Sequence, residues 1–263
     1  MLFLHNLFFS LGELIYSSFL TLKVRSKIQK LSKGDTNILE NLFPYYKNLN
    51  QEHRKDFVSR LEWFIAEKEF VPRGDLKTVT PEMKLLISAT AIMVTFGFKG
   101  VFLRHFRKIL IYPNSYYSSI NQQYHYGEVN PKLGMIVLSW EKFVEGFMHS
   151  QSGVNLGIHE MAHAMKLENQ IHYNRESNFF NPHRWEVYAK EAKQEQNKIL
   201  KGESDIFRAS AGKNMHEFFA VALEVFFEKP LEFSTYNPKL YKSLVYLLKQ
   251  DPLALSGNGS SAV

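Results

Sequence analysis

The segment His159-Glu160-Met161-Ala162-His163 constrains this chain more than any other part of its sequence. Residues four apart lie on one face of an α-helix, so both imidazoles can reach a single Zn²⁺. Glu160 then lies beside the first imidazole, close to a water at the metal. The apolar residues around the motif indicate a buried helix, where unpartnered polar groups cost free energy. The pattern predicts a zinc site, and two core histidines beside a surface glutamate are the alternative.

The residues before the motif supply the start of this helix. The stretch 152–157 is rich in turn formers, and Asn155 is placed to accept hydrogen bonds from the first turn. We therefore expect Asn155 to be the N-cap of the motif helix.

A zinc site of this kind needs a third protein ligand and leaves one position open for water. A third histidine downstream of the motif is excluded, because Lys166 and Asn169 stand where that pattern needs Gly and His. The chain has no cysteine, which excludes thiolate ligands. A glutamate from a second helix remains, and the apolar segment 214–228 offers Glu217. The small side chain of Ala220, one turn further on, would let the two helices approach closely.

Four residues on or near these helices therefore have candidate roles. We assign Glu217 to the metal; the alternative is a first-turn glutamate stabilised by the helix dipole. Glu224, seven residues on, shares its face and is assigned to orient a ligand histidine, with an ordinary salt bridge as the alternative. His216 and His172 are further candidate ligands, and ordinary surface histidines are the alternative for both.

The chain resembles the Mlc titration factor A family of zinc-dependent peptidases, which are gluzincins, from about residue 57 to about residue 253. The segments that carry the resemblance are Phe64–Pro72, Ile109–Pro113, Ile136–Trp140, Gly153–Ile158 and Glu217–Val221 followed by Glu224. The stretch 217–220 also resembles the zinc-ligand helix of anthrax lethal factor. The resemblance implies an α+β, zincin-like fold, rich in helices, with a small mixed sheet beside the motif helix. It also implies that His159, His163 and Glu217 bind one Zn²⁺ and that Glu160 is the general base.

One position departs from the family pattern. Members usually have a tyrosine seven residues before the third ligand, where it is a candidate for stabilising the reacting carbonyl group. This chain has Ser210 at that position. The residues that remain open as its replacement are Tyr173, Tyr188, His172, Arg208 and His216.

These residues predict a zinc metallopeptidase that acts on a peptide or protein, as an aminopeptidase or an endopeptidase. Glu160 takes a proton from the attacking water and delivers it to the leaving amine. We expect Ile136 to Trp140 to form an edge strand with which an extended peptide can pair. Two other functions compete. One is a zinc-containing regulatory protein that sequesters a transcriptional repressor, as the family's namesake does; the other is a membrane-surface or nucleic-acid binder with an incidental motif.

Composition narrows the partners and the compartment. The net charge is +6, but the basic residues are dispersed and no nucleic-acid motif accompanies them, so direct nucleic-acid binding is not expected. The absence of cysteine from 263 residues excludes a disulfide framework and fits a reducing compartment such as the cytoplasm.

We expect three segments along the chain: an apolar N-terminal helix over 1–30, a zincin-like catalytic domain over 31–255, and a disordered tail over 256–263. Residues 1–22 contain one charged residue, Glu13, and basic residues follow them. They are interpreted as an amphipathic helix, packed on the protein or in peripheral contact with a membrane, or else as a poor membrane span. Both interpretations leave the catalytic part on the cytoplasmic side.

Hydrophobic periodicity and turn signals predict the helices and strands of the expected catalytic domain, 31–255. The predicted helices cover 36–48, 51–68, 80–96 and 184–200, and the predicted strands cover 108–112 and 134–140. We expect a loop or hairpin near the cleft at 116–130 and an irregular insertion at 174–182.

Overall fold

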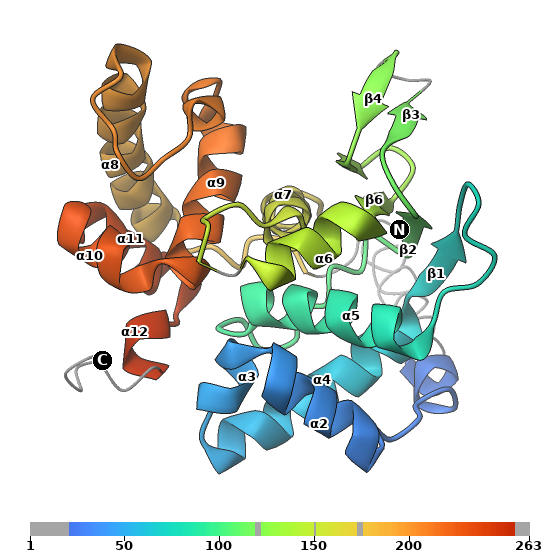
Figure 1. The fold of residues 1–263 in the computed structure, drawn as a ribbon. Coiled ribbons are helices and arrows are strands. Elements are labelled where there is room, and N and C mark those ends of the chain that lie inside the picture. Colours follow the sequence, from blue (N-terminus) through green and yellow to red (C-terminus); the bar gives the residue numbers. More distant parts are fainter. Residues whose placement is uncertain (1–20, 119–121, 150, 173–175, 256–263) are drawn as a thin grey trace, which may run out of the picture.

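The computed structural model describes residues 21–118, 122–149, 151–172 and 176–255 of the chain. Its helices are α2 (Lys33–Leu42), α3 (Pro44–Asn48), α4 (Gln51–Glu67), α5 (Pro81–Thr95), α6 (Trp140–Met148), α7 (Leu156–Glu168), α8 (Pro182–Lys201), η1 (Ala209–Gly212, a 3₁₀ turn), α9 (Met215–Glu228), α10 (Pro230–Tyr236), α11 (Pro238–Leu248) and α12 (Pro252–Leu255). Its strands are β1 (Glu69–Pro72), β2 (Lys108–Tyr112), β3 (Tyr116–Ser118), β4 (Gln123–His125), β5 (Gly127–Asn130) and β6 (Met135–Ser139). Figure 1 shows the arrangement of these elements.

Most of the predicted helices are confirmed, and one is split. The helix predicted over 36–48 is divided into α2 and α3 at Phe43, whose φ of −125° and ψ of 82° lie outside the helical region. Pro44 explains the break, because proline lacks an N–H and disfavours helical geometry in the residue before it. At α5 the predicted start is confirmed: Thr80 accepts a hydrogen bond from the Met83 N–H, and Pro81 is the first helical residue.

The sheet is mixed, with strand order β1-β2-β6-β5. β1, β2 and β6 run parallel, and β5 is antiparallel to β6. Both predicted strands are present, but the prediction that 136–140 forms an edge was wrong. β6 lies between β2 and β5, so β5 is the edge strand at this side of the sheet. β5 and β6 form an antiparallel hairpin through the short connection 131–134, and the sequence prediction missed this local pairing.

Two helices form the centre of the molecule. Every residue of α5 from Leu85 to Thr95 is buried. The motif helix α7 packs against α5, α9 and β5, and Figure 1 shows it near the middle of the molecule. The predicted helix-rich α+β class with a small mixed sheet is therefore confirmed, and the motif helix lies between the sheet and α9.

Some predictions concern residues outside the described part of the chain. These are the apolar segment 1–20, the candidate Tyr173 and the tail 256–263. Among the residues that the structure describes, no helix has both the length and the apolar character needed to span a membrane.

Candidate metal centre

The motif helix begins as its sequence predicts. The Asn155 side chain accepts a hydrogen bond from the Ile158 N–H at 3.0 Å and so caps α7. His159 and His163 follow on one face of the helix, and their Nε2 atoms lie 3.0 Å apart. Both imidazoles therefore point to one place, as residues four apart on a helix should.

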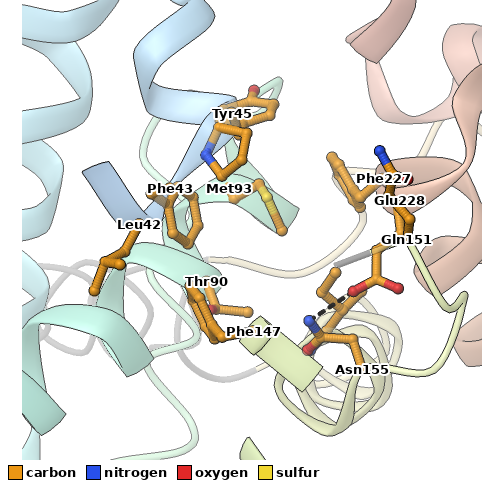
Figure 2. A pocket seen from close by; sticks show the side chains of 12 residues that line it. Leu42, Phe43, Tyr45, Thr90, Met93, Phe147, Gln151, Asn155, Phe227 and Glu228 are labelled. Carbon is orange, nitrogen blue, oxygen red and sulfur yellow. Dashed lines mark hydrogen bonds between the residues drawn. The ribbon is translucent and has the colours of Figure 1, made fainter. Parts of the chain in front are cut away.

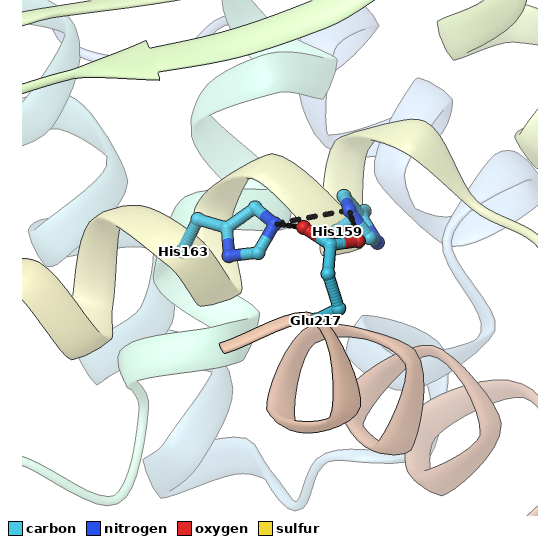
Figure 3. Close-up of side chains that lie close together, drawn as sticks. All are labelled: His159, His163 and Glu217. Atoms are coloured by element: carbon cyan, nitrogen blue, oxygen red, sulfur yellow. Dashed lines mark hydrogen bonds and ion pairs between the residues drawn. The ribbon is translucent and has the colours of Figure 1, made fainter. Parts of the chain in front are cut away.

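The third group comes from the first turn of α9. Asn214 caps this helix and accepts hydrogen bonds from the backbone N–H groups of His216 and Glu217. The Glu217 carboxylate lies 3.3 Å from His163 Nε2 and 3.7 Å from His159 Nε2. Figure 3 shows Glu217 reaching from α9 towards the two histidines on α7.

The three donors fit a zinc ion by type and by spacing. Two imidazole nitrogens and one carboxylate oxygen are ordinary Zn²⁺ ligands. At metal–ligand distances of about 2.0–2.1 Å, a tetrahedron has edges of about 3.3 Å. The two Nε2 atoms lie 3.0 Å apart, Glu217 Oε1 lies 3.3 Å from His163 Nε2, and Glu217 Oε2 lies 3.7 Å from His159 Nε2, so each pair of groups has atoms close to that separation. His159, His163 and Glu217 therefore form a group that can hold a metal ion.

A buried carboxylate orients the first histidine. Glu224 Oε1 lies 2.7 Å from His159 Nδ1, and Glu224 is fully buried. The Arg208 guanidinium donates to both oxygens of Glu224 at 2.6 and 2.9 Å, and the Asn155 N–H donates to Oε2 at 2.6 Å. Burial alone would lower the pKa of His159, but the hydrogen bond to Glu224 and the nearby carboxylates raise it above its usual value. Glu224 thus fixes the ring so that Nε2 faces His163 and Glu217, as a carboxylate behind a ligand histidine does.

The second histidine is held differently. The His163 ring stacks on the His216 ring, with centroids 4.2 Å apart. Its Nδ1 atom is buried and has no hydrogen-bond partner among the described residues. His216 therefore packs against the candidate ligand His163. It is not one of the three described residues whose donor atoms lie close enough together to hold one metal ion.

Two glutamates at the centre have opposite pKa shifts. The hydrogen bond with His163 lowers the pKa of Glu217 to about 2, which keeps its carboxylate available as an anionic donor. Burial raises the pKa of Glu160 to about 7, although the neighbouring His159 opposes the shift. Glu160 lies beside β5, where its side chain occupies the space that a β-carbon at Gly127 would take. A carboxyl group with this pKa can accept and return a proton near neutral pH.

The candidates for replacing the family tyrosine lie in several places. Ser210 is in η1 and accepts a hydrogen bond from Arg208 Nε at 3.0 Å, so it helps to hold the arginine that pairs with Glu224. Tyr188 is buried in α8 against Trp185 and Phe219, and its hydroxyl has no hydrogen-bond partner among the described residues. His172 lies beside Asn178 rather than in the group of donors.

A hollow lies at the start of α7. It has a volume of about 190 Å³, and Figure 2 shows Phe43 and Tyr45 on one side of it and Phe227, Glu228 and Asn155 on the other. Glu228 accepts hydrogen bonds from Asn155 Nδ2 and from the Gly153 N–H, both at 2.9 Å, and burial raises its pKa to about 6. None of the three donors lines this hollow, so it is separate from the metal centre, but its polar wall holds the N-cap of the motif helix.

Comparison with known proteins agrees with this geometry. The family model of the glucose-regulated metallo-peptidase M90 matches residues 21–248. The chain belongs to this family. A protein of Synechocystis sp. with no assigned function is 24% identical over 233 residues, which cover 82% of this chain and 83% of that protein. Mlc titration factor A of Yersinia pestis is 28% identical over 230 residues, covering 80% of this chain and 83% of the relative, and the Yersinia pseudotuberculosis protein matches equally well. Membership in the M90 family and the similarity to the Yersinia proteins confirm the predicted resemblance to the Mlc titration factor A family, and a metallo-peptidase family implies a metal.

Proposed function

We propose that this M90 family member is a zinc-dependent metallopeptidase of the zincin type, with His159, His163 and Glu217 as the ligands. The observation that carries the proposal is that three suitable ligand groups meet at one point: one ligand atom from each residue lies within 4.8 Å of the others, and the two Nε2 atoms are 3.0 Å apart. The family name and the buried Glu160 beside these donors support hydrolysis as the activity.

In this proposal the chain supplies the proton transfers. A bound zinc ion lowers the pKa of water and polarises a carbonyl group. Glu160, whose pKa is about 7, accepts the proton of the attacking water at its carboxylate and delivers it to the amine that leaves. Glu224 keeps the His159 ring in place while charge moves, and Arg208 balances the negative charge of Glu224. The result is cleavage of an amide bond into a carboxylate and an amine.

The substrate in this proposal is an extended peptide chain. β5 is the strand at the edge of the sheet, and it contacts α7, which carries Glu160. The free side of an edge strand offers backbone N–H and C=O groups to a further strand. Tyr117 and Tyr124, which are exposed on the neighbouring β3–β4 hairpin, offer apolar contact to side chains of that peptide.

The test combines metal content with turnover. Elemental analysis would count zinc per chain in the wild type and in Glu160→Gln and Glu217→Ala, and the same samples would be assayed with aminoacyl-anilides and internally quenched peptides. We expect one zinc in the wild type and in Glu160→Gln, little zinc in Glu217→Ala, and turnover in the wild type alone. Cleavage of only one substrate type would decide between aminopeptidase and endopeptidase. A wild type without zinc would refute the proposal.

A second candidate is a regulatory protein that keeps the zinc site but hydrolyses little, and sequesters a transcriptional repressor in the cytoplasm. Two observations favour it: Ser210 replaces the family tyrosine, and the Yersinia relatives are named for the titration of Mlc. One zinc per chain, no turnover by the wild type and full repressor binding by Glu160→Gln would support this function over the first.

A further inference from the structure

Gly127, the first residue of β5, has no conformational reason to be glycine. The glycines with positive φ are Gly74, Gly100, Gly134, Gly153 and Gly202. Gly127 is not among them, and its backbone pairs with Leu138 of β6 in an ordinary antiparallel register. Any residue can adopt that backbone, so the reason for glycine must lie in what surrounds its α-carbon.

That surrounding is the side chain of Glu160. A β-carbon at position 127 would lie 2.6 Å from Cδ and 2.7 Å from Cγ of Glu160, and closer still to Oε1. Non-bonded carbon atoms prefer separations of about 3.5–4.0 Å. The three atoms nearest to such a β-carbon all belong to Glu160, and none belongs to His159, His163 or Glu217. The missing side chain therefore makes the space in which the Glu160 carboxylate lies.

Two sets of contacts hold β5 in its place beside Glu160. Four register pairs join β5 to β6. The next side chain, Glu128, points to the other face of the strand, as alternation requires, and accepts hydrogen bonds from the Tyr116 and Ser118 hydroxyls at 3.3 and 3.1 Å. An added methyl group at 127 would therefore displace Glu160 rather than the strand.

We propose that Gly127 is a positioning residue: by having no side chain, it lets the edge strand hold Glu160 at the metal centre. The predicted effect on turnover rests on the proposed peptidase function, whereas the contact itself does not. A shift of about 1 Å in a catalytic group can lower turnover by about 100-fold. No sequence pattern predicts that Gly127 positions Glu160, because the two residues are brought together only by the fold.

A double-mutant cycle in thermal stability tests the contact. The full-length chain would be compared with Gly127→Ala, Glu160→Ala and the double variant. We expect Gly127→Ala to lower Tm by about 3–10 °C in the wild type and by much less when residue 160 is alanine, because the crowded space is then empty. Gly34→Ala is the control, since its new β-carbon meets only Ser32 Oγ, at 3.4 Å, and it should lower Tm in neither background.

Each outcome of the cycle decides the proposal. An equal loss of Tm in both backgrounds, no loss in either, or failure to fold in both would overturn it. Folding of Gly127→Ala only when Glu160 is also replaced would support it in its strongest form.

Kinetics then separate this proposal from the proposed function. Where the wild type cleaves peptides, Gly127→Ala should lower kcat by about 100-fold with an unchanged KM and one zinc per chain. Loss of zinc in Gly127→Ala would count against a role through Glu160 alone. A wild type with no turnover would refute the peptidase function, and the Tm cycle would still decide the role of Gly127.

Discussion

Glutamates lie against both ends of α7, but their partners differ. Near its start, the Glu217 carboxylate faces imidazole nitrogens that have lone pairs of their own. Near its end, Glu168 accepts hydrogen bonds from the His105 N–H at 3.1 and 3.2 Å. There too, Glu176 accepts hydrogen bonds from the N–H groups of Phe102 and Arg104 at 3.0 to 3.1 Å.

The type of partner distinguishes the candidate metal centre from a cluster of carboxylates that only stabilises the fold. Backbone N–H groups are fixed donors, so a carboxylate that they saturate is held in place and has less room for a cation. Imidazole nitrogens offer lone pairs to the same point as the carboxylate, and a cation satisfies all of them together. Glu168 is fully buried and Glu217 is only half-buried, so the type of partner, rather than burial, distinguishes the candidate metal centre.

The largest expected effect is on zinc affinity, which should depend on Glu217, near the start of α7, and not on Glu168, near its end. Glu217→Ala removes one of three donors, and we expect zinc affinity to fall by more than the roughly 100-fold that follows loss of an outer partner. Competition with a chromophoric chelator would measure it. Glu168→Ala, at the other end of the same helix, is the matched control and should bind zinc as the wild type does. Equal affinities of Glu217→Ala and the wild type would remove Glu217 from the site.

Replacement of Glu168, near the end of α7, should lower the stability of the fold and leave the affinity for zinc unchanged. Glu168 is fully buried, and Glu168→Ala leaves the His105 N–H without this acceptor, so we expect a loss of about 2–3 kcal/mol in the free energy of unfolding. Urea denaturation in the presence of a chelator would measure it. A fall in zinc affinity of the folded variant would show that the two ends are coupled along α7.

A smaller effect is expected behind the first histidine. Glu224→Gln replaces the carboxylate that holds His159, and it should weaken zinc binding by about 10–100-fold. Glu228→Gln is a suitable control, because Glu228 binds Asn155 and Gly153 but does not touch His159. Equal losses in the two variants would mean that Glu224 acts by supporting the helix start and not by orienting the imidazole.

Local sequence patterns were sufficient for much of this centre. The spacing of His159 and His163 places both on one face, and the seven-residue interval between Glu217 and Glu224 places them on a shared face of α9, as the structure shows. Cap and proline signals located two helix starts, that of α7 at Asn155 and that of α5 at Thr80. These features depend on residues within two turns of one another, so periodicity reports them.

Two kinds of feature were not predicted. β5 and β6 form a hairpin through 131–134, a local pairing that the sequence prediction missed, so the edge strand is 127–130 rather than 136–140. The other features depend on contacts between residues far apart in the chain. Arg208 was a candidate for the carbonyl-stabilising role, and the structure instead pairs it with Glu224, sixteen residues away. Glu176, which the sequence placed in an irregular insertion, closes the cluster at the end of α7. A single sequence has no signal for which strands or side chains meet across the fold.

The smallest expected effect concerns the pH dependence of stability at the end of α7. Burial raises the pKa of Glu176 from 4.5 to about 7, although Arg104 beside it opposes the shift. Between these two values the folded chain binds more protons at this group than the unfolded chain does, so stability falls as pH rises. Glu176→Gln removes the titration, and its stability relative to the wild type should increase by about 1–2 kcal/mol between pH 5 and pH 8.

Urea denaturation at several pH values, with a chelator present to exclude metal binding, would measure this difference. Glu160 and Glu228 also have raised pKa values, so the Glu176→Gln variant should keep part of the pH dependence. Parallel curves for the variant and the wild type would mean that the backbone donors keep Glu176 ionised despite burial. The two ends of α7 would then differ in a further respect: backbone N–H groups would keep the Glu176 carboxylate ionised, whereas burial raises the pKa of Glu160, beside the candidate metal donors, to about 7.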